Sequence, residues 1–170
     1  NIYAQKDKYL IEAEAFQFKG KWSTDRSADC MGSAMLRLNG GGSLDEQFDA
    51  LTVVNIMEEG DYNVWVRSAD YDKLPGTRLF RLSVDEKPMK ESGKHGKVGF
   101  YWENAGCVQL AKKQVLLRLH DTKRNFGRCD AILLVKDHSI NPNEMDSKEV
   151  GKWRKNPVKI ETKGSGFDKL

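Results

Sequence analysis

The sequence predicts an all-β protein built as an antiparallel β-sandwich of the jelly-roll kind. Gly60–Ser68 (GDYNVWVRS) follows a Gly-Asp turn signal and alternates in the way a strand requires. Leu51–Ile56 and Thr77–Val84 lie on either side of it, and no helical pattern separates the three segments. Segments of this kind recur about eight to ten times, at the spacing typical of sandwiches and jelly rolls.

Gly60–Ser68 is predicted to be a central strand. Tyr62, Val64 and Val66 share one face and are expected in the core between the sheets. Trp65 lies on the opposite face, so both faces carry a large apolar side chain and need cover.

The other elements follow from the same alternation and from turn residues between them. The remaining predicted strands are Tyr9–Ala15, Ala34–Leu38, Val98–Glu103, Gly106–Leu110, Gln114–His120 and Asp130–Lys136. Polar loops are expected at Lys19–Asp29, Asp70–Gly76, Asp85–Lys97 and Asp121–Arg128. Only short helical turns fit, one after a capping box at Ser43 and one after Pro142.

Composition indicates an ordinary globular chain with no strong preference for charged partners. The 170 residues are 39% hydrophobic and 31% charged, and 28 basic against 25 acidic residues leave a net charge of +3. This balance does not favour nucleic-acid binding. No apolar stretch approaches the roughly 18 residues of a membrane-spanning helix, so membrane insertion is not expected.

We expect one domain with two tails. Residues 1–8 form an N-terminal tail, where Ile2-x-Ala4 matches either a signal-peptidase site or an arbitrary boundary. Residues 9–137 form the sandwich. Residues 138–170 form an extension that ends in the linker-like Lys163–Leu170 (KGSGFDKL), which would lead into a further domain.

The three cysteines match no zinc-binding spacing, and three thiols cannot all pair. We predict that Cys30, Cys107 and Cys129 are small buried residues, with one disulfide and a free thiol as the alternative.

Two glutamates on one face of the first strand suggest a cation site. Glu12 and Glu14 would lie roughly 7 Å apart, and their charges need compensation. Ca²⁺ would supply it, because carboxylate and carbonyl oxygens are its usual ligands. The alternative is a solvated strand face with Lys6, Lys8 or Lys19 nearby.

Catalytic patterns are absent from the sequence. His95, His120 and His138 are scattered, and no hydrolase, metalloprotease or nucleotide-binding motif accompanies them. His120 beside Asp121 and His138 beside Asp137 are interpreted as surface pairs rather than general bases. The chain is therefore not expected to be an enzyme.

Taken in order, the motifs resemble a known family. IEAEAF, a loop carrying Trp22, GDYNVWVR, GCVQL and CDAILL are similar to carbohydrate-binding modules of families six and thirty-five. They are also similar to related domains attached to secreted bacterial polysaccharide-degrading enzymes and FAD-dependent oxidoreductases. The resemblance covers Tyr9 to Asp137 and implies a galactose-binding-domain-like jelly roll.

The resemblance also implies a structural Ca²⁺. In that family the glutamate pair and the aspartate opening the last strand bind the ion, and the matching residues here are Glu12, Glu14 and Asp130. Arg128 stands in a position where the family pattern differs, and its guanidinium paired with the carboxylates is the alternative to a metal.

Sugar binding in that family uses loops at one end of the sandwich. The matching candidates are Trp22, Tyr71 and Asn125, with Arg124 placed to pair with a uronate or a sulfate. Trp22 is the preferred stacking platform, whereas Trp102 is expected in the core.

Two functions remain open from the sequence. The first is a non-catalytic carbohydrate-binding module of a larger bacterial protein, secreted, periplasmic or on the cell surface, that binds a polysaccharide or oligosaccharide. The second is an accessory β-sandwich that packs against an adjacent enzyme domain and binds no sugar.

Overall fold

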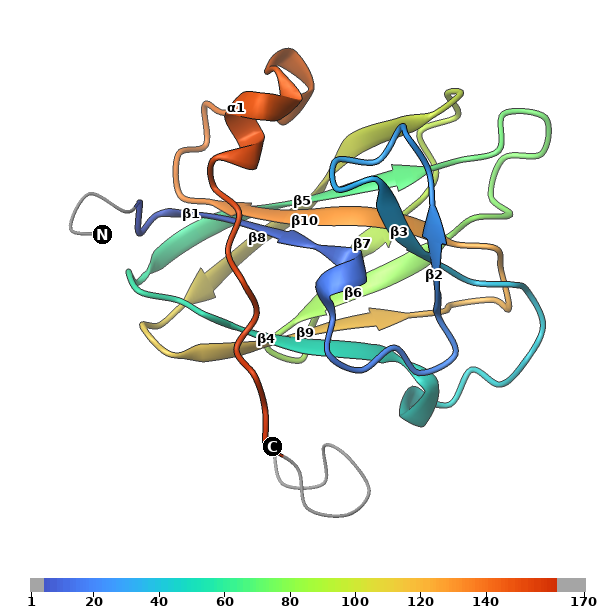
Figure 1. Ribbon diagram of the computed structural model, residues 1–170, viewed down its shortest axis with the longest axis horizontal. Coiled ribbons are helices and arrows are strands. Elements are labelled where there is room, and N and C mark those ends of the chain that lie inside the picture. Colours follow the sequence, from blue (N-terminus) through green and yellow to red (C-terminus); the bar gives the residue numbers. More distant parts are fainter. Residues whose placement is uncertain (1–4, 162–170) are drawn as a thin grey trace.

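The computed structural model describes residues 5–161, and it confirms the predicted antiparallel β-sandwich (Figure 1). One sheet has the strand order β2-β3-β10-β5-β8, with β1 also paired to β10. The second sheet has the order β4-β9-β6-β7.

The strands of the first sheet are β1 (Lys8–Glu12), β2 (Ser23–Arg26), β3 (Ala34–Arg37), β5 (Gly60–Ala69), β8 (Phe100–Leu110) and β10 (Arg128–Val135). Those of the second sheet are β4 (Ala50–Asn55), β6 (Phe80–Val84), β7 (Lys87–Ser92) and β9 (Gln114–His120). Short helical turns are η1 (Ala13–Ala15), η2 (Glu46–Phe48), η3 (Pro142–Glu144) and α1 (Ser147–Gly151). Among the described residues no helix is long and apolar enough to cross a membrane.

The core between the sheets is organised around β5, as predicted. This strand pairs with β10 on one side and β8 on the other. Tyr62, Val64 and Val66 are fully buried and pack with β9 side chains such as Leu117 from the second sheet.

β8 differs from the prediction of two strands joined by a hairpin. It is one strand interrupted by a bulge, since Val64 pairs with Gly106 and Trp65 pairs with Asn104. Ala105 is the extra residue, and Gly106 adopts a φ of +119°, a region that favours glycine. The turn residues at 104–106 therefore produce a bulge rather than a reversal.

Two strands were expected to be loops. β2 and β7 carry mostly polar residues, so their sequences lack the apolar alternation of a strand. β7 forms a hairpin with β6 through Asp85 and Glu86, which adopt φ values of +51° and +67°. Turns of this primed type usually contain asparagine or glycine. Because this turn contains neither, the sequence gives no signal for the hairpin.

The segment after β10 packs on the sandwich through Ile160, and we call residues 138–160 the C-terminal strap. It crosses the outer face of the first sheet and continues to β4 of the second (Figure 1). Leu10 donates a backbone hydrogen bond to Trp153, and Val158 donates one to Val53. The predicted linker Lys163–Leu170 and the signal-peptidase motif at residues 2–4 lie outside the described residues.

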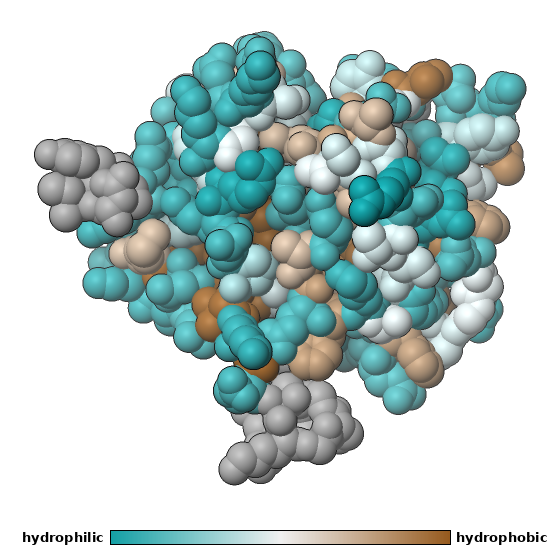
Figure 2. Space-filling view, in the orientation of Figure 1, coloured by the Kyte–Doolittle hydropathy of each residue, from teal (hydrophilic) through white to brown (hydrophobic). Residues whose placement is uncertain are grey.

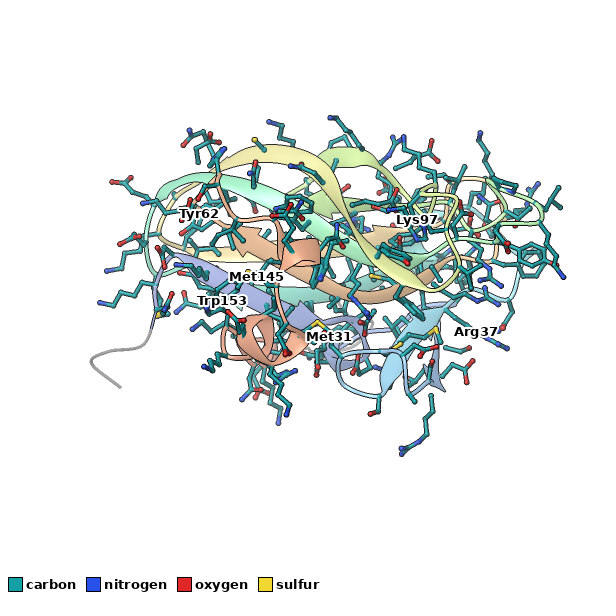
Figure 3. All side chains as sticks on the ribbon, turned by 90° about the horizontal axis from the view of Figure 1, so that it is seen from above. Met31, Arg37, Tyr62, Lys97, Met145 and Trp153 are labelled. Carbon is teal, nitrogen blue, oxygen red and sulfur yellow. The ribbon has the colours of Figure 1, made fainter. Side chains whose placement is uncertain are left out.

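The strap covers a second apolar cluster on the outer face of the first sheet. Trp153 and Val150 pack there against Leu10 and Leu133, and Met31 and Met145 add to the cluster. Figure 3 shows Met145, Trp153 and Met31 in the region of the strap. Figure 2, in the orientation of Figure 1, shows that hydrophilic residues dominate that face of the molecule.

The cysteines only partly match their prediction. Cys30 and Cys129 are buried, whereas Cys107 is exposed, and all three are free thiols. The bulge explains the exposure, because it places Cys107 on the outer face between the inward-facing Ala105 and Val108.

Candidate functional site

Two loops meet at one end of the sandwich and are joined by a backbone hydrogen bond. One loop, residues 70–79, links β5 to β6, and the other, residues 121–127, links β9 to β10. Phe126 donates from its backbone N–H to the carbonyl of Thr77 at 2.8 Å. The two loops therefore hold one another in place.

A groove of about 260 Å³ opens between these loops. It is lined by Tyr71, Leu74, Thr77, Arg78, Phe126 and Arg128. Tyr71 is 39% exposed and Phe126 is 47% exposed, which is unusual for aromatic side chains. Two accessible rings beside one groove provide apolar faces for a ligand.

The groove is also positively charged. The Arg78 guanidinium lies over the Tyr71 ring, 5.2 Å from its centroid. Burial, together with the nearby charges of Arg78 and Arg37, lowers the pKa of Arg128 to about 10. Arg37 has Asp25 as an ion-pair partner at 3.1 Å, whereas Arg78 and Arg128 have no carboxylate within 4.0 Å among residues 5–161. Within that range both guanidinium groups donate only to backbone carbonyls, of Asp70 and Phe126, and guanidinium groups without a carboxylate partner favour an anionic ligand.

Trp22 is not part of this groove, and its predicted role as a stacking platform is wrong. Its side chain is only 3% exposed and belongs to the core between the sheets. The indole Nε1 donates to the carbonyl of Leu119 at 3.1 Å, and the ring meets Phe80 edge-on. A ring enclosed in this way has no free face for a sugar.

The other predicted ligand residues have different positions. Tyr71 lines the groove, as described above, but Arg124 and Asn125 do not. Asn125 donates from Nδ2 to the carbonyl of Leu79, and Arg124 donates from Nε to the carbonyl of Gly42. Both therefore hold the loop that presents the next residue, Phe126.

Sequence reasoning missed Phe126. The signal was present, because an aromatic residue directly follows Asn125 in a loop already expected to contact ligand. Trp102 is buried, as expected, but in the outer cluster under the strap.

The second candidate site is a group of carboxylates near the start of β10. Asp130 is fully buried at a bulge in β10, and Glu12 and Glu14 come from β1 and η1. Gly32 lies against the two glutamates, since a Cβ there would be 2.4 Å from Glu12 Oε1 and from Glu14 Oε2. The structure thus brings Glu12 and Glu14 together around Gly32, with Asp130 near enough to influence them.

Burial and mutual repulsion disfavour ionisation of Glu14 and Asp130 in this carboxylate cluster. Burial raises the pKa of Glu14 to about 7, and the charges of Glu12 and Asp130 contribute. Burial also raises the pKa of Asp130. Glu14 Oε1 and Asp130 Oδ1 are buried oxygens with no hydrogen-bond partner. Buried polar atoms without partners are costly, so these two oxygens require an explanation.

Arg128 does not neutralise the cluster, which corrects that alternative. It lines the groove instead. Arg67 donates to Asp130 Oδ2 at 2.6 Å, and Arg154 of the strap donates to Glu12 Oε1 at 2.9 Å. These contacts leave the two unpaired oxygens of Glu14 and Asp130 unsatisfied. The ligand atoms of the three carboxylates do not all lie within 4.8 Å of one another.

The histidine environments also differ from the sequence interpretation. His120 Nδ1 lies 2.7 Å from the buried carboxylate of Asp49 rather than pairing with Asp121. Asp121 pairs with Lys21 at 2.8 Å, and Asp137 accepts hydrogen bonds from Ser139.

The architecture places this chain among β-sandwiches with the fold of carbohydrate-binding modules of families 35 and 6. A family 35 module from Clostridium thermocellum is 17% identical, with a TM-score of 0.57 over 74% of this chain and 97% of the module. The C-terminal family 6 module of the laminarinase LamC from Zobellia galactanivorans is 15% identical, with a TM-score of 0.58 over 76% of this chain and 100% of the module.

Longer enzymes contain the same fold. A β-(1,4)-mannanase with a family 35 module from Podospora anserina is 18% identical, with a TM-score of 0.60 over 82% of this chain. This chain spans 31% of that mannanase and 29% of an exo-β-1,3-galactanase from Phanerochaete chrysosporium. No protein-family model and no curated protein sequence matches the chain.

Proposed function

We propose that this chain is a non-catalytic carbohydrate-binding module of a larger exported bacterial protein. The observation that carries the proposal is the groove with two exposed rings, Tyr71 and Phe126, at the loop end of the sandwich. The faces of a pyranose are rich in C–H groups, and aromatic rings suit such faces. The proposed ligand is a polysaccharide outside the cytoplasm, so the proposal includes a secreted, periplasmic or cell-surface location.

The proposed ligand carries negative charge, such as a uronic acid or a sulfated sugar. Arg78 and Arg128 are the groups that would meet that charge, because neither has a carboxylate partner among the described residues. A planar guanidinium binds a carboxylate or a sulfate through paired hydrogen bonds.

The experiment is a glycan array on the isolated chain, followed by calorimetric titration with a uronate-containing oligosaccharide and its neutral counterpart. Tyr71→Ala and Phe126→Ala should each weaken binding by about 1 kcal/mol, roughly fivefold, through lost aromatic contact. Phe48→Ala is the matched control, because Phe48 is 38% exposed but does not line the groove.

Retained affinity in both groove variants would refute this site. Failure of the folded native chain to bind any glycan would instead favour the alternative, an accessory β-sandwich that packs against a neighbouring domain.

We further propose that the carboxylate cluster binds a structural Ca²⁺. Support comes from the two buried oxygens without partners, on Glu14 and Asp130, and from the raised pKa of Glu14. Glu12, Glu14 and Asp130 are the residues that would hold the ion, and oxygen donors of this kind match its preference. The bound ion would neutralise a charge cluster that Arg67 and Arg154 only partly compensate.

Thermal unfolding with Ca²⁺ and with chelator tests the calcium proposal. An ion bound only by the folded state at 100 times its Kd adds about 2.7 kcal/mol, which raises Tm by several degrees in a protein of this size. Asp130→Asn should abolish the increase, whereas Asp72→Asn in the exposed loop should preserve it. A melting temperature that does not change when chelator is added would disprove the calcium proposal.

A further inference from the structure

A third group of side chains lies away from the groove and the carboxylate cluster. Asp61 of β5, Cys107 of β8 and the exposed His138, which follows β10, place one ligand atom each within 4.8 Å of one another. Figure 3 shows Tyr62, the neighbour of Asp61, and Arg37 toward opposite ends of the long axis. Arg37 marks the end with the groove, because its charge acts on the groove residue Arg128. The group is therefore remote from the sugar groove.

The backbone directs each of these side chains away from the core between the sheets. Asp61 occupies the outer face of β5, since the adjacent Tyr62 is buried between the sheets. The bulge in β8 turns Cys107 to the same face, opposite Asn63 in the strand pairing. Asp137 Oδ1 accepts hydrogen bonds from the N–H and hydroxyl of Ser139, which shapes the turn that carries His138.

The contacts within the group involve the atoms that would bind a metal. His138 Nε2 lies 3.5 Å from Asp61 Oδ2. The Cys107 thiol donates to Oδ1 of Asn63 at 2.9 Å, so the sulfur is oriented by a side chain that is itself 6% exposed. Two donors bound to one tetrahedral metal at roughly 2.0–2.3 Å are separated by about 3.2–3.8 Å. The imidazole–carboxylate separation already lies in that range.

We propose that Asp61, Cys107 and His138 form a binding site for a borderline transition-metal ion of the Zn²⁺ class. Thiolate sulfur, imidazole nitrogen and carboxylate oxygen are the donors that Zn²⁺ takes in proteins, and three protein ligands leave a fourth position for water. Binding requires the thiolate, so the Cys107 thiol loses its proton to solvent when the metal enters.

The position of the site gives the metal a structural consequence. Asp61 and Cys107 belong to neighbouring strands, whereas His138 begins the strap that covers the outer face of the sheet. A bound ion would tie the start of the strap to β5 and β8. Removing the metal should therefore loosen the strap before it affects the core between the sheets.

The test uses tag-free protein, reduced and saturated with Ca²⁺ so that the carboxylate cluster does not compete. Competition with a chromophoric chelator should show one Zn²⁺ per chain. Co²⁺ should produce a thiolate-to-metal charge-transfer band, and Zn²⁺ should protect Cys107, the one exposed thiol of the three, from alkylation. Cys107→Ser and His138→Gln should each weaken Zn²⁺ binding by at least about 100-fold.

Two controls keep the result specific. Asp72→Asn removes an exposed carboxylate elsewhere and should leave Zn²⁺ affinity unchanged, and native Cys30 and Cys129 remain in every variant. Equal Zn²⁺ affinity in the native chain and in Cys107→Ser would overturn the proposal, as would a Co²⁺ spectrum without the thiolate band. Loss of Zn²⁺ binding in a variant with an unchanged melting temperature would support it.

Discussion

At the scale of single residues, Trp22 shows how an aromatic loop residue becomes part of a core. Its indole N–H finds a backbone partner at Leu119, and its ring contacts Phe80 edge-on. The polar atom is therefore satisfied while the apolar body stays out of water. Tyr71 and Phe126 lack such enclosure, and both line the groove.

Trp22→Ala is expected to destabilise the fold by about 3–5 kcal/mol, the range for truncating a buried tryptophan. Urea unfolding followed by fluorescence and circular dichroism measures the effect, with Phe48→Ala as an exposed aromatic control. Glycan affinity of the folded fraction should not change. A variant as stable as the native chain would show that Trp22 is not a core residue.

Glu14 predicts a pH dependence in the absence of Ca²⁺. Its folded-state pKa of about 7 lies above the ordinary value of 4.5, so the folded state holds the proton more tightly than the unfolded state. The free energy of unfolding then falls as pH rises from 4.5 to 7, because ionising the buried carboxyl opposes folding. Its stabilising contribution is complete below pH 4.5 and lost above pH 7.

Glu14→Gln removes that ionisation. In chelator at pH 8 the variant should melt above the native chain, whereas at pH 4.5 the two should melt at similar temperatures. Added Ca²⁺ should reverse the order at pH 8, because only the native side chain is a charged ligand. Melting curves at both pH values measure this, and a variant that melts below the native chain in chelator at pH 8 would contradict it.

At the scale of elements, the strap is the main addition to the sandwich. Trp153 packs on the outer face of β1 and β10, accepts a backbone hydrogen bond from Leu10, and lies under the Lys8 ammonium. The strap also supplies Arg154 to Glu12. This element therefore connects the apolar outer face with the carboxylate cluster.

Trp153→Ala should destabilise the chain by about 3 kcal/mol or more, because the ring is only 8% exposed. Hydrogen exchange should accelerate first at the β1 amides that bond to the strap, such as that of Leu10. Lys152→Ala, an exposed neighbour, serves as the control. Unchanged protection at Leu10 would mean that the strap does not depend on this side chain.

At the scale of the whole molecule, charged residues are unevenly distributed. The chain carries a net charge of only +3, yet Arg78, Arg128 and Arg37 lie close enough for their charges to influence one another. The groove thus concentrates positive charge at one end of a nearly neutral protein. Such local fields are strongly screened by salt.

Affinity for a uronate-containing glycan should therefore fall as ionic strength rises. Between 0.1 M and 1 M salt the Debye length shortens from about 10 Å to about 3 Å, which weakens an exposed charge contact. Calorimetric titrations across that range measure it, with Arg78→Ala expected to flatten the dependence. A salt-independent Kd for the acidic glycan would argue against recognition by the arginines.

The sequence by itself determined the sandwich and the central place of β5. It also determined that Tyr62, Val64 and Val66 of this strand face the core. Those features depend on local alternation, which any strand must show along its own length. It also placed Tyr71, a predicted ligand residue, in a loop. The polar strand β2 was not predicted from the sequence, because its formation depends on pairing with β3 and not on an apolar pattern of its own.

Only the tertiary structure decided which side chains meet. Whether Trp22 is covered depends on Phe80 and Leu119, which are remote in the sequence. Phe126 lines a groove to which a second loop, remote in the sequence, also contributes. The Asp61, Cys107 and His138 group joins segments separated by tens of residues, so no spacing could reveal it. Local patterns specify strands, but burial and charge pairing are properties of the contacts that the folded chain makes.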